Sequence, residues 1–508
     1  MGRAREGQRV PVVRATTAGR VGGVQYRPFG SAVWRGVPYG TVRPGGGRFA
    51  GPVRPEPWER VRPALRHGPV SWQLPPVHDQ ASGTLRDFGF AHTAGPEHED
   101  CLNLDVYSPD PGRAGLPVLV WFHPGMQVAG SGNMPGRRPE VLSRNHGVVV
   151  VTMNFRLGCW GHLFLDELDE LDGPAGPTEP AALGGLSEQD TANVRLRDQV
   201  LALTWVKENI AAFGGDAGNV TLFGESAGAH NIGSLLGCGA AEGLFERAAL
   251  YSGGCENVVT REAATGFARE FLECAGLTGA PGRLRTVPNV HLRMAHERLL
   301  RRHGIVHYRD VVDGTYLSYP PIGAIAAGTS GKVDLLVSNT ADEAGLWDLL
   351  MPGGARVVAH GARTGVPAAR YGTDHEAFIN AELFLRPSRD LLRTKSASGS
   401  GRCWYQVYDH VPSDHGLADV GRAVHGMDLA SLLLDLSAPG TASETDVTVA
   451  RHVQGALVEF ARGRGPSSGG VPWPVYDRAA EQLVRIGREP RVESAAWPPD
   501  DDHAAVGR

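Results

Sequence analysis

The chain has 508 residues, of which 42% are hydrophobic and 21% charged, so it can build a large core and lacks the balance of a disordered chain. Its 68 Gly and 36 Pro make up about a fifth of the sequence, against about 12% in an average protein, which excludes a coiled coil or a helical bundle. The formal net charge of −5 argues against nucleic acid as the main partner.

Signals for export and membrane insertion are absent from the sequence pattern. Residues 1–23 contain no apolar run of about 7–15 residues, so we expect no secretory signal. No stretch reaches the ~18 apolar residues that span a bilayer, and we expect no membrane partner. The six cysteines include no CxxC pair, which disfavours a disulfide framework and a zinc site. A reduced, cytoplasmic compartment is the predicted location.

Short apolar runs rich in β-branched residues alternate with helical patterns along the chain. Five runs predict buried strands: 116–122, 147–153, 220–223, 247–251 and 334–337. Residues 198–213 carry apolar side chains at helical spacing and predict a helix.

The predicted strands do not alternate apolar and polar side chains, which is typical of parallel strands buried on both faces. The predicted fold class is therefore α/β, with a central, mostly parallel, twisted sheet covered by helices. No repeat or composition break divides the sequence, so we expect one domain over 1–508 with helical insertions at about 260–400. Residues 172–181, residues 353–375 and the tail from Ala495 are predicted to lack regular structure.

The motif that most clearly carries chemistry is GESAG, from Gly224 to Gly228, directly after a predicted buried strand. A serine hydroxyl is a weak nucleophile and must stand exposed to a base. A tight strand-to-helix turn exposes it, and glycines two residues before and after relieve the crowding of that turn. Ser226 is therefore the candidate nucleophile, and the alternative for this motif is an ordinary glycine turn.

A serine nucleophile needs a base, and the base needs an acid to orient it. In this type of sheet the acid and then the histidine follow the serine along the chain. Many of the 19 histidines follow Ser226, so spacing alone leaves base and acid open. Neither HExxH nor GxxxxGK[ST] occurs, so metal and nucleotide sites receive no support. Acyl transfer by a serine triad needs no cofactor, and none is expected.

Residues 213–228 (FGGDAGNVTLFGESAG) resemble the nucleophile signature of the type-B carboxylesterase family of α/β-hydrolases. Residues 99–104 (EDCLNL) resemble the second signature of that family, and similar segments continue to residues 473–477 (WPVYD). The resemblance implies the α/β-hydrolase fold and a small-molecule ester as substrate.

The same resemblance implies the other members of a catalytic triad. Residues 338–343 (SNTADE) match the segment that ends in the acid of the family, which makes Glu343 the acid and leaves Asp342 as its neighbouring alternative. His425 begins a match to HGxDL and is implied as the base. The chain order Ser226, Glu343, His425 is the order expected for the fold.

The oxyanion hole departs from the family pattern. Relatives carry HGGG where this chain has HPGM, from His123 to Met126. By position, the backbone N–H groups of Gly125, Met126 and Ala227 are the predicted donors. Our hypothesis is that Met126 narrows the space around the ester carbonyl and disfavours esters of tertiary alcohols. The alternative is that Met126 points into the core.

Other residues that match the family are expected to be structural. Glu99 and Arg156 resemble its buried ion pair. Cys101 resembles a cysteine that forms a disulfide in secreted relatives, but the partner segment, residues 69–73, has no cysteine, so a free thiol is expected. Residues 193–199 read NVRLRDQ where relatives usually carry a glycine, and the sequence offers no functional account of this change.

The predicted function is therefore a serine carboxylic-ester hydrolase that works through a Ser-His-Glu triad and an acyl-enzyme. An alternative keeps the triad but passes the acyl group to another acceptor, as in a biosynthetic acyltransferase, lactonase or cyclising enzyme. A third reading, a non-catalytic interaction protein, is disfavoured because the serine is present and no membrane segment is predicted.

Overall fold

The computed structural model describes residues 8–27, 31–43, 47–74, 95–134, 138–168, 191–303, 308–346, 371, 374–413, 420–434 and 442–498. The predicted irregular segment at 172–181 lies outside these residues, as do most of 353–375 and the tail beyond Pro498.

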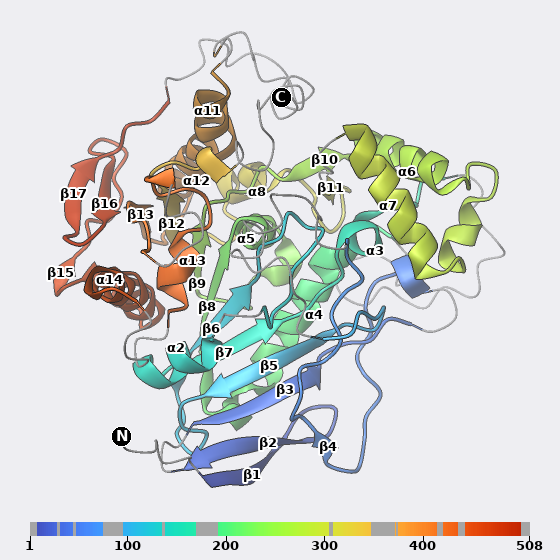
Figure 1. Cartoon of the computed structure of the whole chain (residues 1–508), viewed down its shortest axis with the longest axis horizontal. Helices are drawn as coiled ribbons and strands as arrows, with labels where there is room; N and C mark the ends of the chain where they lie inside the picture. Colours follow the sequence, from blue (N-terminus) through green and yellow to red (C-terminus); the bar gives the residue numbers. More distant parts are fainter. Residues whose placement is uncertain are drawn as a thin grey trace.

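The described residues form one large sheet with a parallel centre (Figure 1). The strand order is β1-β2-β3-β5-β7-β6-β8-β9-β12-β13-β16-β17, with β4 beside β2. Pairings from β7 through β16 are parallel, and those from β7 out to β1 and of β16 with β17 are antiparallel. The strands are β1 (Gln8–Ala15), β2 (Arg20–Arg27), β3 (Ala32–Pro38), β4 (Arg62–Pro63), β5 (Asn103–Ser108), β6 (Leu116–Phe122), β7 (Val149–Met153), β8 (Gly215–Glu225), β9 (Arg247–Tyr251), β12 (Asp334–Thr340), β13 (Cys403–Tyr408), β16 (Gln482–Ile486) and β17 (Arg491–Ser494). This arrangement confirms the predicted α/β class with a mostly parallel central sheet.

Helices and two small strand pairs surround this sheet. The longer helices are α2 (Pro139–His146), α4 (Val194–Asn209), α5 (Ala227–Leu236), α6 (Arg261–Ala275), α7 (Asn289–His303), α12 (Arg386–Ser398) and α14 (Glu444–Ala461). The short ones are η1 (Gly47–Phe49), α3 (Gly158–His162), η2 (Ile210–Phe213), η3 (Gly239–Ala241), η4 (Pro281–Arg285), α8 (Pro321–Ala326), α11 (His375–Phe378), η6 (Ile379–Leu385) and α13 (Asp428–Leu432). The small pairs are β10 (Val258–Thr260) with β11 (Asp310–Val312), and β14 (Ser467–Ser468) with β15 (Val471–Pro472).

Both faces of the central strands are buried, and successive side chains enter two different cores. On β6, Val118, Val120 and Phe122 belong to the core that includes α4, α5 and α12. Leu119 and Trp121 belong to the core that includes α2, α13 and α14. Because apolar side chains are needed on both faces, these strands show no polar alternation.

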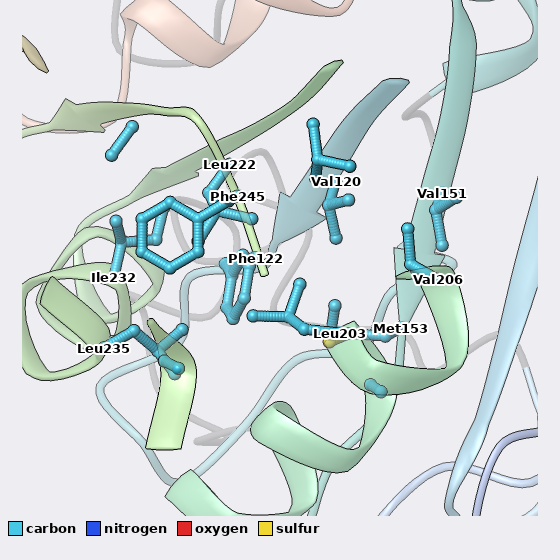
Figure 2. Close-up of a cluster of buried hydrophobic side chains, with 14 of the residues drawn as sticks. Val120, Phe122, Val151, Met153, Leu203, Val206, Leu222, Ile232, Leu235 and Phe245 are labelled. Carbon is cyan, nitrogen blue, oxygen red and sulfur yellow. The ribbon is translucent and has the colours of Figure 1, made fainter. Parts of the chain in front are cut away.

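Figure 2 shows part of the first core. Phe122 of β6 lies among Leu222 of β8, Ile232 of α5 and Leu203 of α4, all at 0% exposure. This packing anchors the end of β6 and the start of α5. These two points carry the candidate oxyanion loop and the candidate nucleophile.

The predicted boundaries of helices and strands agree best with the structure where apolar side chains mark the ends of an element. The strands predicted at 116–122 and 247–251 coincide with β6 and β9. The run at 220–223 is the apolar part of β8, which begins at Gly215. The helix predicted at 198–213 begins earlier in the structure, since α4 starts at Val194. The prediction missed its first turn because the buried residue there, Arg195, is charged, and apolar periodicity does not reveal it.

The predicted helical insertions include α6 and α7, which lie together to one side of the sheet (Figure 1). They share a core with η1 and α3, in which Phe271 and Leu292 are fully buried. Strand β12 of the main sheet also falls within 260–400, so the insertions are not one continuous segment. The assignment of 1–508 to a single domain stays a prediction.

All six cysteines are buried and free. Within the ranges that the structure describes, no helix combines the length and the apolar character needed to cross a membrane.

Candidate active site

Ser226 stands at the turn between β8 and α5, as the GESAG motif predicts. Its backbone angles, φ 53° and ψ −121°, are rare for a residue with a side chain and cost about 1–3 kcal/mol. A Cβ at Gly224 would lie 2.7 Å from the carbonyl carbon of Gly228, and one at Gly228 would lie 2.1 Å from the carbonyl oxygen of Phe122. The turn therefore admits only glycine on both sides of the serine.

The structure brings the three predicted triad residues together. The Nε2 atom of His425 lies 2.9 Å from Oγ of Ser226, and its Nδ1 atom lies 2.7 Å from Oε2 of Glu343. The second oxygen of Glu343, Oε1, accepts a hydrogen bond of 2.9 Å from the N–H of Thr340. Because Glu343 and His425 are both at least 95% buried, these bonds are shielded from competing water.

Loops that follow strands β12 and β13 carry the acid and the histidine. The N–H of Asp342 donates to the carbonyl oxygen of Ala423 over 3.0 Å, which joins the two loops just before Glu343 and His425. The Asp342 carboxylate instead lies 2.9 Å from the guanidinium of Arg422. The geometry thus favours Glu343 over its neighbour as the partner of the histidine.

Buried carboxylates dominate the electrostatics around His425. Burial by itself lowers the pKa of His425, but the carboxylates of Glu225 and Glu343 outweigh it and raise that pKa to about 9. The Glu225 carboxylate lies 3.4 Å from Nε2 of His425. Burial and the charge of Glu343 raise the pKa of the Asp428 carboxyl to about 7. Burial also disfavours ionised Glu343, but its hydrogen bond to His425 gives a net lowering of the Glu343 pKa.

The loop after β6 carries two of the three predicted oxyanion donors. Gly125 has φ 128°, and a Cβ there would lie 2.0 Å from the carbonyl oxygen of Ala129. Met126 and Gln127 follow with φ 54° and 64°, in the left-handed region that costs residues with side chains about 1–2 kcal/mol each. Among the described residues, no hydrogen bond occupies the N–H groups of Gly125 and Met126.

Met126 is 37% exposed, so the alternative that it points into the core is wrong. Ala227, the third predicted donor, is the first residue of α5. The N–H groups in the first turn of a helix lack partners within the helix and favour negative charge. The loop after β6 and the start of α5 therefore both offer N–H groups suited to an oxyanion.

The predicted ion pair between Glu99 and Arg156 is wrong. The guanidinium of Arg156 donates from Nε and Nη2 to the carboxylate of Asp198, over 2.9 and 2.5 Å, and both side chains are buried. This contact is bidentate, with two guanidinium nitrogens donating to the two oxygens of one carboxylate, which is a strong geometry for such a pair. Glu99 instead accepts from Arg48 over 2.6 Å and from Asn289 over 2.6 Å.

Sequence reasoning missed two side chains that touch the candidate site. Glu225 occupies the first variable position of GxSxG, directly before the serine, and only the structure shows its carboxylate beside His425. Gln127 follows the oxyanion loop, and its amide donates to the carbonyl oxygen of Ala227 over 3.1 Å. A polar residue directly after HPGM was the available signal for Gln127.

Known proteins resemble the chain over nearly all of its length. The Carboxylesterase family matches residues 9–178 and 182–360. A para-nitrobenzyl esterase of Bacillus subtilis (strain 168) is 30% identical over 489 residues, which cover 91% of this chain and 92% of the relative. Liver carboxylesterase 1F of Rattus norvegicus is 28% identical over 543 residues, with 94% and 90% covered.

Solved structures agree with these relatives. A structure of PNB esterase superposes with a TM-score of 0.80 at 29% identity, and the match covers 95% of this chain and 96% of that one. A carboxylesterase of Geobacillus stearothermophilus gives a TM-score of 0.78 at 29% identity, with 95% and 97% covered. The chain therefore belongs to the type-B carboxylesterase family of α/β-hydrolases and is an enzyme of the carboxylesterase class.

Proposed function

We propose that the chain hydrolyses carboxylic esters through a covalent acyl-enzyme on Ser226, with His425 as base and Glu343 as the acid that orients it. The observation that carries this proposal is the position of His425, whose two ring nitrogens lie 2.9 and 2.7 Å from Ser226 Oγ and Glu343 Oε2. A histidine held between a hydroxyl and a buried carboxylate can accept the proton of that hydroxyl and remain oriented while charged.

In the first half of the reaction, Oγ of Ser226 attacks the ester carbonyl carbon as its proton passes to Nε2 of His425. The carbonyl oxygen becomes an oxyanion, which the N–H groups of Gly125, Met126 and Ala227 stabilise. The C–O bond to the alcohol then breaks, and His425 gives its proton to the departing alkoxide. The acyl group remains as an ester of Ser226.

In the second half, His425 takes a proton from water, and the resulting hydroxide attacks the acyl carbon. A second oxyanion forms in the same place and collapses, breaking the bond to Oγ of Ser226. The carboxylic acid leaves, and the serine regains its proton from His425. The substrate class proposed is a small-molecule ester, in line with the name of the para-nitrobenzyl esterase that resembles this chain.

The test removes the nucleophile. Ser226→Ala is expected to lower kcat for a p-nitrophenyl ester by at least about 10⁴-fold and to abolish labelling by a fluorophosphonate probe. The matched control is Ser234→Ala, a buried serine within α5, which is expected to keep both activities. Turnover retained by Ser226→Ala would contradict the proposal. Analysis of products with added alcohols separates hydrolysis from transfer to another acceptor.

A further inference from the structure

Behind the candidate oxyanion loop lies a chain of four buried polar side chains from four separate segments. They are Gln127 after β6, Asn231 of α5, Arg195 of α4 and Asp310 of β11, and none is more than 4% exposed. Buried polar groups are costly unless they are hydrogen-bonded. The four side chains bond to one another, and among them Nε of Arg195 and Nδ2 of Asn231 have no hydrogen-bond partner within the described residues.

Gln127 is the member that touches the candidate site. Its Nε2 atom donates to the carbonyl oxygen of Ala227 over 3.1 Å and to Oδ1 of Asn231 over 2.6 Å. The backbone carbonyl oxygen of Gln127 accepts a hydrogen bond from the N–H of Gly158 over 2.7 Å. Since Met126 and Ala227 lie on different segments, the Gln127 amide ties the loop of one predicted donor to the helix of another.

Arg195 fixes the partner of Gln127. Its Nη1 atom donates to the same Oδ1 of Asn231 that accepts from Gln127. Its Nη2 atom lies 2.5 Å from each carboxylate oxygen of Asp310, which balances the buried charge. With two donors on one oxygen, the Asn231 amide has a single favourable orientation, and Gln127 must donate to it.

These hydrogen-bonded side chains also give a structural role to the segment at residues 193–199 (NVRLRDQ), for which the sequence alone offered no account. Arg195 stands at the third position of this segment and is fully buried. The oxyanion loop departs from glycine at Met126, and both Met126 and Gln127 take positive φ values. The N–H groups of Val128 and Ala129 close the loop on the carbonyl oxygen of Gly125, and contacts from outside the loop add to these bonds in holding a backbone conformation that glycine would adopt freely.

We propose that Gln127 is a positioning residue of the oxyanion hole, and that Asn231, Arg195 and Asp310 fix its amide so that the N–H groups of Met126 and Ala227 converge on one point. The inference rests on the proposed function, because it assigns a role within that hole. Gln127 does not touch the reacting atoms. It sets the separation between donors that do.

The test replaces Gln127 with Met, which keeps the length of the side chain and removes both hydrogen bonds to α5. We expect kcat on a p-nitrophenyl ester to fall about 10- to 100-fold, because misplaced donors lose transition-state stabilisation, while KM stays within about threefold. Affinity for a trifluoromethyl ketone, which forms a tetrahedral oxyanion on the serine, should fall by the same factor as kcat/KM. Rates are expressed per active site, and the concentration of active sites is measured by titration with a fluorophosphonate.

The control is Asn209→Leu at the far end of α4, which also removes a buried amide with hydrogen bonds to Thr17 and Trp205. It is expected to lower the thermal midpoint but to leave kcat and ketone affinity per titrated site unchanged. A second variant, Arg195→Met with Asp310→Leu, removes the buried charges together and should lower kcat and ketone affinity in parallel by about 3- to 10-fold.

Parent-like kcat and ketone affinity in a folded Gln127→Met enzyme would overturn the inference, as would equal losses in Asn209→Leu. Failure of the proposed function looks different, because the parent would then lack esterase activity or Ser226→Ala would retain it. A Gln127→Met protein that does not fold leaves the double variant as the deciding measurement, and unchanged ketone affinity there overturns the inference.

Discussion

Two strained turns meet at the candidate site, and they are held in different ways. The nucleophile turn on Ser226 has glycine where a Cβ would strike backbone, at Gly224 and Gly228. The oxyanion loop keeps one such glycine, Gly125, and then places Met126 and Gln127 at positive φ. The glycines that make room for the first turn belong to its own motif, whereas the second turn also relies on side chains from α4, α5 and β11. In the nucleophile turn the strained residue is Ser226, and the glycines on either side of it supply the space that the turn needs.

The largest effect expected on the nucleophile turn comes from its distant partner, the acid. Glu343→Gln should lower kcat about 10³- to 10⁴-fold, because an amide no longer stabilises the charged imidazole and can hold the wrong tautomer. The neighbouring Asp342→Asn is the matched control and should lower kcat less than about tenfold, since its carboxylate faces Arg422. Steady-state kinetics on a p-nitrophenyl ester measures both. Equal losses in the two variants would contradict the assignment of Glu343.

The glycine requirement of the nucleophile turn can be broken directly. Gly228→Ala places a Cβ about 2.1 Å from the carbonyl oxygen of Phe122, so β6 and α5 must separate. The free energy of unfolding should fall by about 2–4 kcal/mol, and kcat should fall with it. Urea denaturation checks the first quantity. Gly266→Ala in α6, where a Cβ would meet nothing within 4 Å, is expected to be neutral or slightly stabilising.

The same contrast explains how far the sequence could predict this protein. GESAG, HGMDL and SNTADE are contiguous motifs, so Ser226, His425 and Glu343 could be named before the structure showed them within hydrogen-bond distance of one another. The parallel sheet was predictable because burial on both faces leaves an unbroken apolar run.

Contacts between distant segments were not predictable in this way. Arg156 pairs with Asp198 rather than Glu99, and Gln127 bonds to Asn231 across 104 positions. Such pairs depend on which segments the fold brings together, and many arginines and carboxylates offer the same local pattern. The buried start of α4 was missed for the same reason, since Arg195 reads as polar until Asp310 is seen beside it.

A smaller effect concerns the charge beside the nucleophile. The carboxylates around His425 raise its pKa to about 9, and only the neutral imidazole can act as base, so kcat/KM should rise with pH through that pKa. Glu225→Gln removes a charge that favours the imidazolium, so the midpoint of the profile should move to lower pH, by about one unit. Glu256→Gln, beside His230, is the matched control and should leave the profile unchanged. A Glu225→Gln profile that moves to higher pH would contradict this account.

The smallest expected effect tests the oxyanion loop at Met126. Met126→Gly relieves the cost of a positive φ but makes the unfolded chain more flexible, so the free energy of unfolding should change by less than about 1 kcal/mol. Because the Met126 side chain is 37% exposed rather than packed in the core, its loss leaves no internal cavity and instead opens space beside the donors. Hydrolysis of a tertiary-alcohol ester should therefore increase relative to that of the matching primary ester, as measured by kcat/KM for each. Unchanged selectivity would show that Met126 does not limit access to the carbonyl. With Gln127 still in place, the glycine variant should keep its activity on primary esters, because we expect the hydrogen bonds of Gln127 to α5, rather than the side chain at position 126, to hold the loop.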